Sequence, residues 1–271
     1  MLGKRLLAII IMLSIGLPAI IMGGVPFALI IALILGVAAW EFGRMFRLVD
    51  LNASFPILVG GVVVLLLVRA KFPQAAVAVA VFLVLAAMVW HLVDYERGRD
   101  SAASDFTVTV TGLAYLGWIG AYLVDLRELP EGMWWMFIVL PVTWVADSGA
   151  YLIGRAFGRT QFSPRLSPKK TWEGFWAGAI LGTLAAPGLV SLYQHFGGPV
   201  VTFWQALLFG IVLSTLPALG DLGESMFKRQ AGVKDSSQII PGHGGVFDRI
   251  DSWLWAAVLG YYLIRWLSLN A

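Results

Sequence analysis

Long apolar stretches separated by short polar segments follow one another along almost the whole chain. Apolar runs of about 17–25 residues match the thickness of a bilayer core. Together with the absence of strand-like alternation, they predict an all-α polytopic membrane protein of about nine transmembrane helices. The expected spans are residues 5–22, 26–46, 55–69, 73–93, 106–125, 133–157, 173–194, 202–219 and 252–267.

Basic residues are distributed unevenly around these spans. With the N-terminus in the cytoplasm, the outer side carries Arg69, Lys71, Arg127 and Arg265. The inner side carries Lys4, Arg5, Arg44, Arg47, Arg97, Arg99, Arg155, Arg159, Arg165, Lys169, Lys170, Lys228, Arg229, Lys234 and Arg249. Because cytoplasmic loops of membrane proteins are enriched in Lys and Arg, this asymmetry predicts a cytoplasmic N-terminus and two long cytoplasmic loops, residues 158–171 and 228–249.

Composition agrees with a lipid-solvated chain. Of the 271 residues, 59% are hydrophobic and 13% charged, and the mean hydropathy is +0.82. There is no cysteine, which excludes disulfides, thiolate metal sites and a cysteine nucleophile. We expect residues 1–130 to form a scaffold of about five helices, and residues 131–271 to form the catalytic region of about four helices with both long loops.

The most polar stretch of the chain is residues 225–251. Its charged residues are Lys228, Arg229, Lys234, Asp235, Asp248, Arg249 and Asp251, and a glycine-rich turn lies among them. Cations, carboxylates and flexible glycines suit the binding of a polyphosphate and its metal ions. The alternative is a solvated loop between two membrane helices.

The start of this stretch predicts a polar stripe. In a helix, Asp221, Glu224, Ser225 and Lys228 fall at positions i, i+3, i+4 and i+7, on one face of an apolar rod. An internal Glu224–Lys228 pair would explain two of them and leave Asp221 without a cation. Asp221 and Asp248 are therefore the best candidates for oxygen ligands of Mg²⁺.

Two further polar features lie upstream. Asp147 lies inside a predicted span, where a carboxylate marks either a functional site or a hydrogen bond between closely packed helices. Lys169 and Lys170 precede the predicted helix that Ser167 or Thr171 can cap. Phosphate binding at this helix N-terminus is one role for the two lysines. Fixing membrane topology or contacting anionic lipid is the other.

The turn itself contains Gly242, His243, Gly244 and Gly245. Glycines allow a close backbone approach, so amides there could face phosphate oxygens. His243 could donate a hydrogen bond to phosphate or act as a general acid. The alternative is that its side chain is simply solvated. No GxxxxGK[ST] loop, GxSxG elbow or HExxH helix occurs, so the motifs of P-loop enzymes and of common hydrolases are absent from the sequence.

Residues 225–251 resemble the signature of the phosphatidate cytidylyltransferases, also called CDP-diacylglycerol synthases. The matching residues are Ser225, Phe227, Lys228, Arg229, Lys234, Asp235, Pro241, His243, Gly244, Gly245, Asp248, Arg249, Ile250 and Asp251. The segments 167–174 and 147–151 are also similar to the family, whereas the first five spans match it in hydropathy alone.

The resemblance implies that CTP and phosphatidic acid react to give CDP-diacylglycerol and pyrophosphate, and that the reaction requires Mg²⁺. A second divalent cation or a monovalent cation is a further option. It also implies an all-helical fold and a homodimer. The distribution of basic residues predicts an active site that faces the cytoplasm. The compact size without extensions suggests a bacterial inner membrane, and no nucleic-acid partner is expected. The residues expected to act in catalysis are Asp221, Asp248, Lys228, Arg249 and His243. Those expected to bind substrate are Lys169, Lys170, Ser225, Arg229, Lys234, Gly244 and Gly245, and the expected metal ligands are Asp221, Asp248 and Asp147. Asp235 and Asp251 are expected to hold the basic residues in place.

Other function classes remain open at this point. A polyprenol kinase or an archaeal-type lipid cytidylyltransferase would also use CTP at a membrane. An ion-coupled transporter with Asp147 and Asp221 on its path is a more distant alternative, because the charges cluster on one face instead of extending through the membrane.

Overall fold

The computed structural model describes residues 2–240, 242 and 244–269, with side chains described from residue 12 to residue 267. His243, a predicted site residue, lies outside the described residues. The chain divides into two compact units. Unit 1 comprises Met1–Asp125 and Phe227–Ile250, and unit 2 comprises Leu126–Met226 and Asp251–Ala271.

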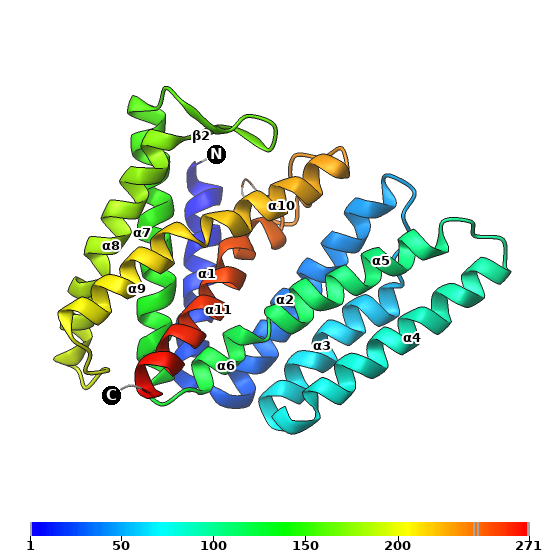
Figure 1. Cartoon of the computed structure of the whole chain (residues 1–271), viewed down its shortest axis with the longest axis horizontal. Helices are drawn as coiled ribbons and strands as arrows, with labels where there is room; N and C mark the ends of the chain where they lie inside the picture. The colour runs from blue at the N-terminus through cyan, green and yellow to red at the C-terminus, as the bar shows by residue number, and fades with distance from the viewer. Residues whose placement is uncertain (1, 241, 243, 270–271) are drawn as a thin grey trace. The chain divides into compact units, whose positions relative to one another are not determined.

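Unit 1 is built mainly from the N-terminal helices (Figure 1). They are α1 (Leu2–Met22), α2 (Gly24–Arg47), α3 (Phe55–Lys71), the short η1 (Pro73–Ala75), α4 (Ala76–Glu96), α5 (Ala102–Gly112) and the π-helical η2 (Leu113–Ile119). Phe42 packs edge to face with Phe227, with ring centroids 5.3 Å apart, and with Phe247, with ring centroids 6.1 Å apart. These apolar contacts join the end of α2 to residues from the predicted signature segment.

Unit 2 contains the remaining helices and a small hairpin. Its elements are α7 (Gly132–Phe157), β1 (Gln161–Ser163), β2 (Ser167–Thr171), α8 (Trp172–Gln194) and α9 (Phe203–Thr215). The helices α6 (Tyr122–Glu128), α10 (Ala218–Gln230) and α11 (Phe247–Leu269) contribute residues to both units.

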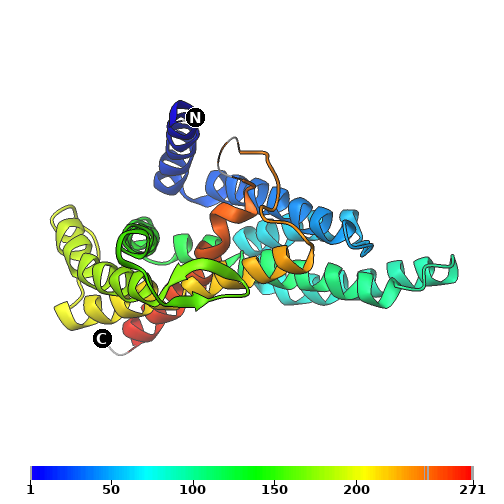
Figure 2. The ribbon, with the colours of Figure 1, turned by 90° about the horizontal axis from the view of Figure 1, so that it is seen from above.

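Small residues allow α7 and α8 to lie side by side (Figures 1 and 2). Gly174, Gly178 and Gly182 recur every four residues along one face of α8. A Cβ atom at Gly178 would lie 2.4 Å from the carbonyl oxygen of Ala146, so a larger residue would force the helices apart. This close approach is the small-residue packing expected where lipid supplies no hydrophobic drive for association.

The prediction of helical spans is confirmed for most of the chain. Six described segments are long and apolar enough to cross a membrane: Gly24–Arg47, Pro73–Glu96, Ala102–Glu128, Gly132–Phe157, Trp172–Gln194 and Phe203–Gln230. The other three expected spans lie within α1, α3 and α11. Nine crossings and a cytoplasmic N-terminus stay predictions.

Three local features differ from the predicted pattern. The antiparallel pair β1–β2 occupies part of the first long loop, where strands of three and five residues are too short to produce visible alternation. The fifth expected span changes from α5 to a π-helical turn before α6. The eighth ends at Thr215, because Pro217 lacks an amide proton and interrupts the hydrogen-bond ladder before α10 begins.

Candidate metal centre

The predicted polar stripe is present on α10. Asp221, Glu224, Ser225 and Lys228 all lie within Ala218–Gln230, which confirms the helical spacing. Glu224 is completely buried and Ser225 is 7% exposed. The Ser225 hydroxyl donates to a carboxylate oxygen of Asp221, one turn earlier, at 3.4 Å. The stripe is therefore turned toward protein over much of its length.

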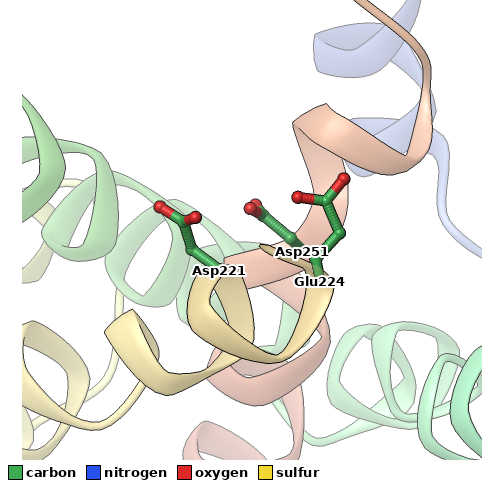
Figure 3. Close-up of side chains that lie close together, drawn as sticks. All are labelled: Asp221, Glu224 and Asp251. Atoms are coloured by element: carbon green, nitrogen blue, oxygen red, sulfur yellow. The ribbon is translucent and has the colours of Figure 1, made fainter. Parts of the chain in front are cut away.

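Two carboxylates of this stripe lie close to a third carboxylate of unit 2. Asp221 and Glu224 come from α10 and Asp251 comes from α11, and one oxygen of each lies within 4.8 Å of the others. Figure 3 shows the side chains of Asp221 and Glu224 on α10 and of Asp251 at the start of α11, close to one another. We call this set the acidic cluster. Asp251, which the sequence assigned to holding basic residues, is one of its members.

Gly220 makes the cluster possible. A Cβ atom at this position would lie 2.5 Å from the carbonyl oxygen of Asp251 and 2.7 Å from the ring of Trp255. Any side chain here would therefore push α10 away from α11 and separate Asp221 from Asp251. The glycine that precedes the first acidic residue is thus part of the construction of the site.

Lys170 supplies a positive charge next to the cluster. Its ammonium group lies 2.6 Å from Asp221, and both side chains are partly exposed. The hairpin and the cap of α8 hold the lysine in place, because Thr171 accepts a hydrogen bond from the amide of Gly174 at 3.2 Å. Of the two capping residues considered from the sequence, Thr171 is the one used. The cation that Asp221 lacked in the sequence interpretation is Lys170.

Asp147 is linked to the acidic cluster by hydrogen bonds of Ser252 on α11. The Ser252 hydroxyl donates to Asp147 at 3.5 Å, and the backbone amide of Ser252 donates to Asp251 at 2.7 Å. Asp147 therefore has a hydrogen bond between helices, as one of the two sequence interpretations proposed. Its role as a metal ligand stays a prediction.

The acidic cluster fits a divalent cation of the hard, oxygen-binding class. Two full negative charges within 4.8 Å of each other repel by at least about 3 kcal/mol at an effective dielectric constant of ~20. Three such groups in a largely buried position favour either a further cation beside the lysine or a shared proton. Mg²⁺ is bound in proteins by one or two carboxylates together with water and substrate phosphates. The donor set suits that chemistry.

Asp248, the second predicted metal ligand, has a different environment in unit 1. Its Oδ1 lies 2.6 Å from the ammonium group of Lys228, and the two side chains are 5% and 11% exposed. Its Oδ2 accepts from the amide and the hydroxyl of Ser236 and from the amide of Gly245, at 2.8–2.9 Å. Asp221 lies in unit 2, so the pairing of Asp221 with Asp248 in one metal site stays a prediction.

Gly244 and Gly245 lie close to the carboxylate of Asp248. Gly242 and Gly244 have φ near +80°, and a Cβ atom at Gly244 would lie 2.8 Å from Asp248. The amide of Gly245, predicted to face phosphate, donates to Asp248. Phosphate binding by Gly244 and Gly245 stays a prediction, with this hydrogen bond as the observed alternative.

The other predicted substrate-binding residues are on the surface. Lys169, Arg229, Lys234 and Arg249 are exposed, and Arg229 donates to the carbonyl oxygen of Val233 at 3.1 Å. Exposed cations remain accessible to an anionic ligand. Their assignment to particular phosphates stays a prediction.

Sequence interpretation missed Glu41. This residue lies in α2, is completely buried, and accepts hydrogen bonds from residues 236, 237, 246 and 247. Glu41 is a carboxylate inside an apolar predicted span, and the same feature identified Asp147 as a candidate.

Fold and site together define an α-helical integral membrane protein with a buried acidic cluster on two of its helices. The chain matches the model of the cytidylyltransferase family over residues 3–267, and it belongs to that family. A protein of Pseudomonas aeruginosa named phosphatidate cytidylyltransferase is 36% identical over 99% of this chain and 98% of its own length. Proteins of the same name from Staphylococcus saprophyticus and Bacillus subtilis are 33% and 31% identical, over 94% and 98% of this chain and 96% and 98% of their own lengths.

Proposed function

We propose that this protein is an enzyme that transfers the cytidylyl group of CTP to phosphatidic acid at a membrane surface. A phosphate oxygen of phosphatidic acid forms a bond to the α-phosphorus of CTP, the bond from that phosphorus to the bridging oxygen breaks, and pyrophosphate leaves. CDP-diacylglycerol is the second product. The names of the full-length relatives support this substrate pair. The acidic cluster, in a chain of this family, is the observation that carries the proposal.

Asp221, Glu224 and Asp251 are the proposed ligands of Mg²⁺. When bound, the ion would neutralise charge on the phosphates and on the leaving pyrophosphate. The nucleophile is already an anion, so the reaction needs no strong general base, in keeping with a site rich in carboxylates and cations. Asp147 and Asp248 remain further candidates for the same role.

The basic residues near the two sets of carboxylates are proposed to hold the anionic parts of both substrates. Lys228, Arg229, Lys234 and Arg249 would bind the triphosphate, and Lys169 and Lys170 the lipid phosphate or pyrophosphate. Lys170 lies 2.6 Å from Asp221, so on this proposal it links phosphate binding to the acidic cluster. His243 is proposed to donate a hydrogen bond to a phosphate oxygen. Ser225 is proposed as a polar neighbour of Asp221.

The test is incubation of purified protein with labelled CTP and phosphatidic acid in detergent. We expect release of pyrophosphate and formation of a labelled lipid, both abolished by chelating divalent cations. Replacing phosphatidic acid with a polyprenol or an archaeal-type lipid acceptor tests the other CTP-using enzymes. A transporter would release no pyrophosphate with any acceptor. Absence of nucleotide-dependent product in all of these would refute the proposal.

The proposed orientation places the active site at the cytoplasmic face of a bacterial inner membrane, with a homodimer as the proposed assembly. The chain has no cysteine, so a single introduced cysteine reports its own position. We expect Arg165→Cys, in the exposed turn between β1 and β2, to react with an impermeant thiol reagent in inverted vesicles and not in intact cells. The opposite pattern would reverse the orientation.

A further inference from the structure

Glu41 connects α2 to two parts of the segment that resembles the family signature, residues 236–237 and residues 246–247. One carboxylate oxygen accepts from the hydroxyl of Ser237 at 2.5 Å and from the amide of Val246 at 3.0 Å. The other accepts from the hydroxyl of Ser236 at 3.1 Å and from the amide of Phe247 at 2.8 Å. One side chain thus receives four hydrogen bonds from residues about two hundred positions away.

Only a carboxylate can accept all four of these hydrogen bonds. The amides of Val246 and Phe247 are fixed donors, and they point to different oxygens of Glu41. A glutamine would place a donor NH₂ group against one of them in either orientation of its amide. A buried backbone N–H would then lose its acceptor, an arrangement that folded proteins avoid.

The backbone fits closely around this carboxylate. A Cβ atom at Gly245 would lie 2.1 Å from the Ser236 hydroxyl and 2.6 Å from Glu41. Glycine at this position is therefore required by the buried acid, whether or not a phosphate binds nearby. Glu41 itself has no exposed surface, so it cannot contact a substrate in this arrangement.

The contacts of Glu41 continue to the basic residues. Ser236 donates through its hydroxyl to Asp248 at 2.8 Å as well as to Glu41, and Asp248 holds the ammonium group of Lys228 at 2.6 Å. All of these residues belong to unit 1. A shift of Ser236 would therefore be transmitted to Lys228 through Asp248.

We propose that Glu41 is the positioning residue that holds residues 236–237 and 246–247 and, through Ser236 and Asp248, sets the geometry with which Lys228 meets the nucleotide. This inference rests on the proposed function, because it takes CTP as the ligand of the basic residues. Loss of Glu41 then weakens CTP binding while the reacting groups remain in place.

The experiment compares wild type, Glu41→Gln, Glu41→Asp and the control Glu96→Gln, an exposed carboxylate at the end of α4. CTP and phosphatidic acid are varied separately in the pyrophosphate-release assay. For Glu41→Gln we expect KM for CTP to rise at least about tenfold, with a smaller change in kcat and in KM for the lipid. Glu41→Asp keeps both acceptor oxygens on a shorter side chain, so its KM should fall between those of wild type and Glu41→Gln.

A second measurement does not depend on turnover. Lys234 is exposed, and we expect trypsin to cleave after it at least about threefold faster in Glu41→Gln than in wild type and Glu96→Gln, at a temperature where all remain folded. An unchanged cleavage rate, or a KM for CTP within twofold of wild type, would overturn the role of Glu41. Wild-type protein that is inactive with CTP would instead refute the proposed function, and the cleavage comparison would still report on the contacts of Glu41.

Discussion

Neutralising one member of the acidic cluster should stabilise the protein when no divalent cation is present. Asp251→Asn removes one of three negative charges and keeps an oxygen that can accept from the Ser252 amide at 2.7 Å. Each pair of full charges within 4.8 Å repels by about 3 kcal/mol at an effective dielectric constant of ~20, and the substitution eliminates two of the three pairs. Lys170 and shared protons reduce this sum, and we expect a net gain of roughly 1–2 kcal/mol.

Divalent cations should make wild type more stable than Asp251→Asn, the reverse of the order expected without them. At a free Mg²⁺ concentration ten times its dissociation constant, binding to the folded state adds about 1.4 kcal/mol. Wild type gains this stabilisation and Asp251→Asn largely loses it, because one of three ligands is gone. For domains of comparable size, 1 kcal/mol corresponds to a shift of about 2–4 °C in Tm.

The assay is thermal unfolding in detergent, first with chelator and then with increasing Mg²⁺. Asp100→Asn is the matched control, since it makes the same chemical change at an exposed position between α4 and α5. We expect Asp251→Asn to melt at least about 2 °C above wild type in chelator and to respond little to Mg²⁺. If it melts below wild type in chelator, or if its response to Mg²⁺ equals that of wild type, the cluster is not the metal site.

Three further predictions follow from contacts of individual residues. Lys170→Met should lower the Mg²⁺ concentration at which Tm rises, because a cation 2.6 Å from Asp221 is lost. The control Lys169→Met, at an exposed position, should leave that concentration unchanged. Gly220→Ala should destabilise by about 1–3 kcal/mol because its Cβ would lie 2.5 Å from a carbonyl oxygen. The Tm of Gly188→Ala, with nothing within 4 Å of its added Cβ, should not fall. Lys228→Met should cost roughly 3 kcal/mol by separating a buried ion pair, and adding Asp248→Asn should recover much of that loss in the same melting experiment.

The sequence predicted the features that depend on local spacing. The stripe on α10 followed from helical periodicity, and the cap of α8 from the preference for Thr before a helix. Three contacts could not be derived, because each joins residues distant in sequence. They are Lys170 with Asp221, Asp251 with the two acids of α10, and Glu41 with the backbone of Val246 and Phe247. Periodicity identifies which face of a helix is polar, but it does not identify the partner of that face.

The two sets of carboxylates differ in how their lone pairs are used, and this difference bears on which acid binds metal. Asp248 accepts three protein hydrogen bonds on one oxygen and holds Lys228 with the other, so a metal would have to displace these partners. Asp221, Glu224 and Asp251 instead face one another, and mutual repulsion favours any cation that enters between them. The same amino acid in the same polar segment therefore serves two purposes. In Asp248 it organises a loop, and in Asp251 it concentrates negative charge at the proposed cation site.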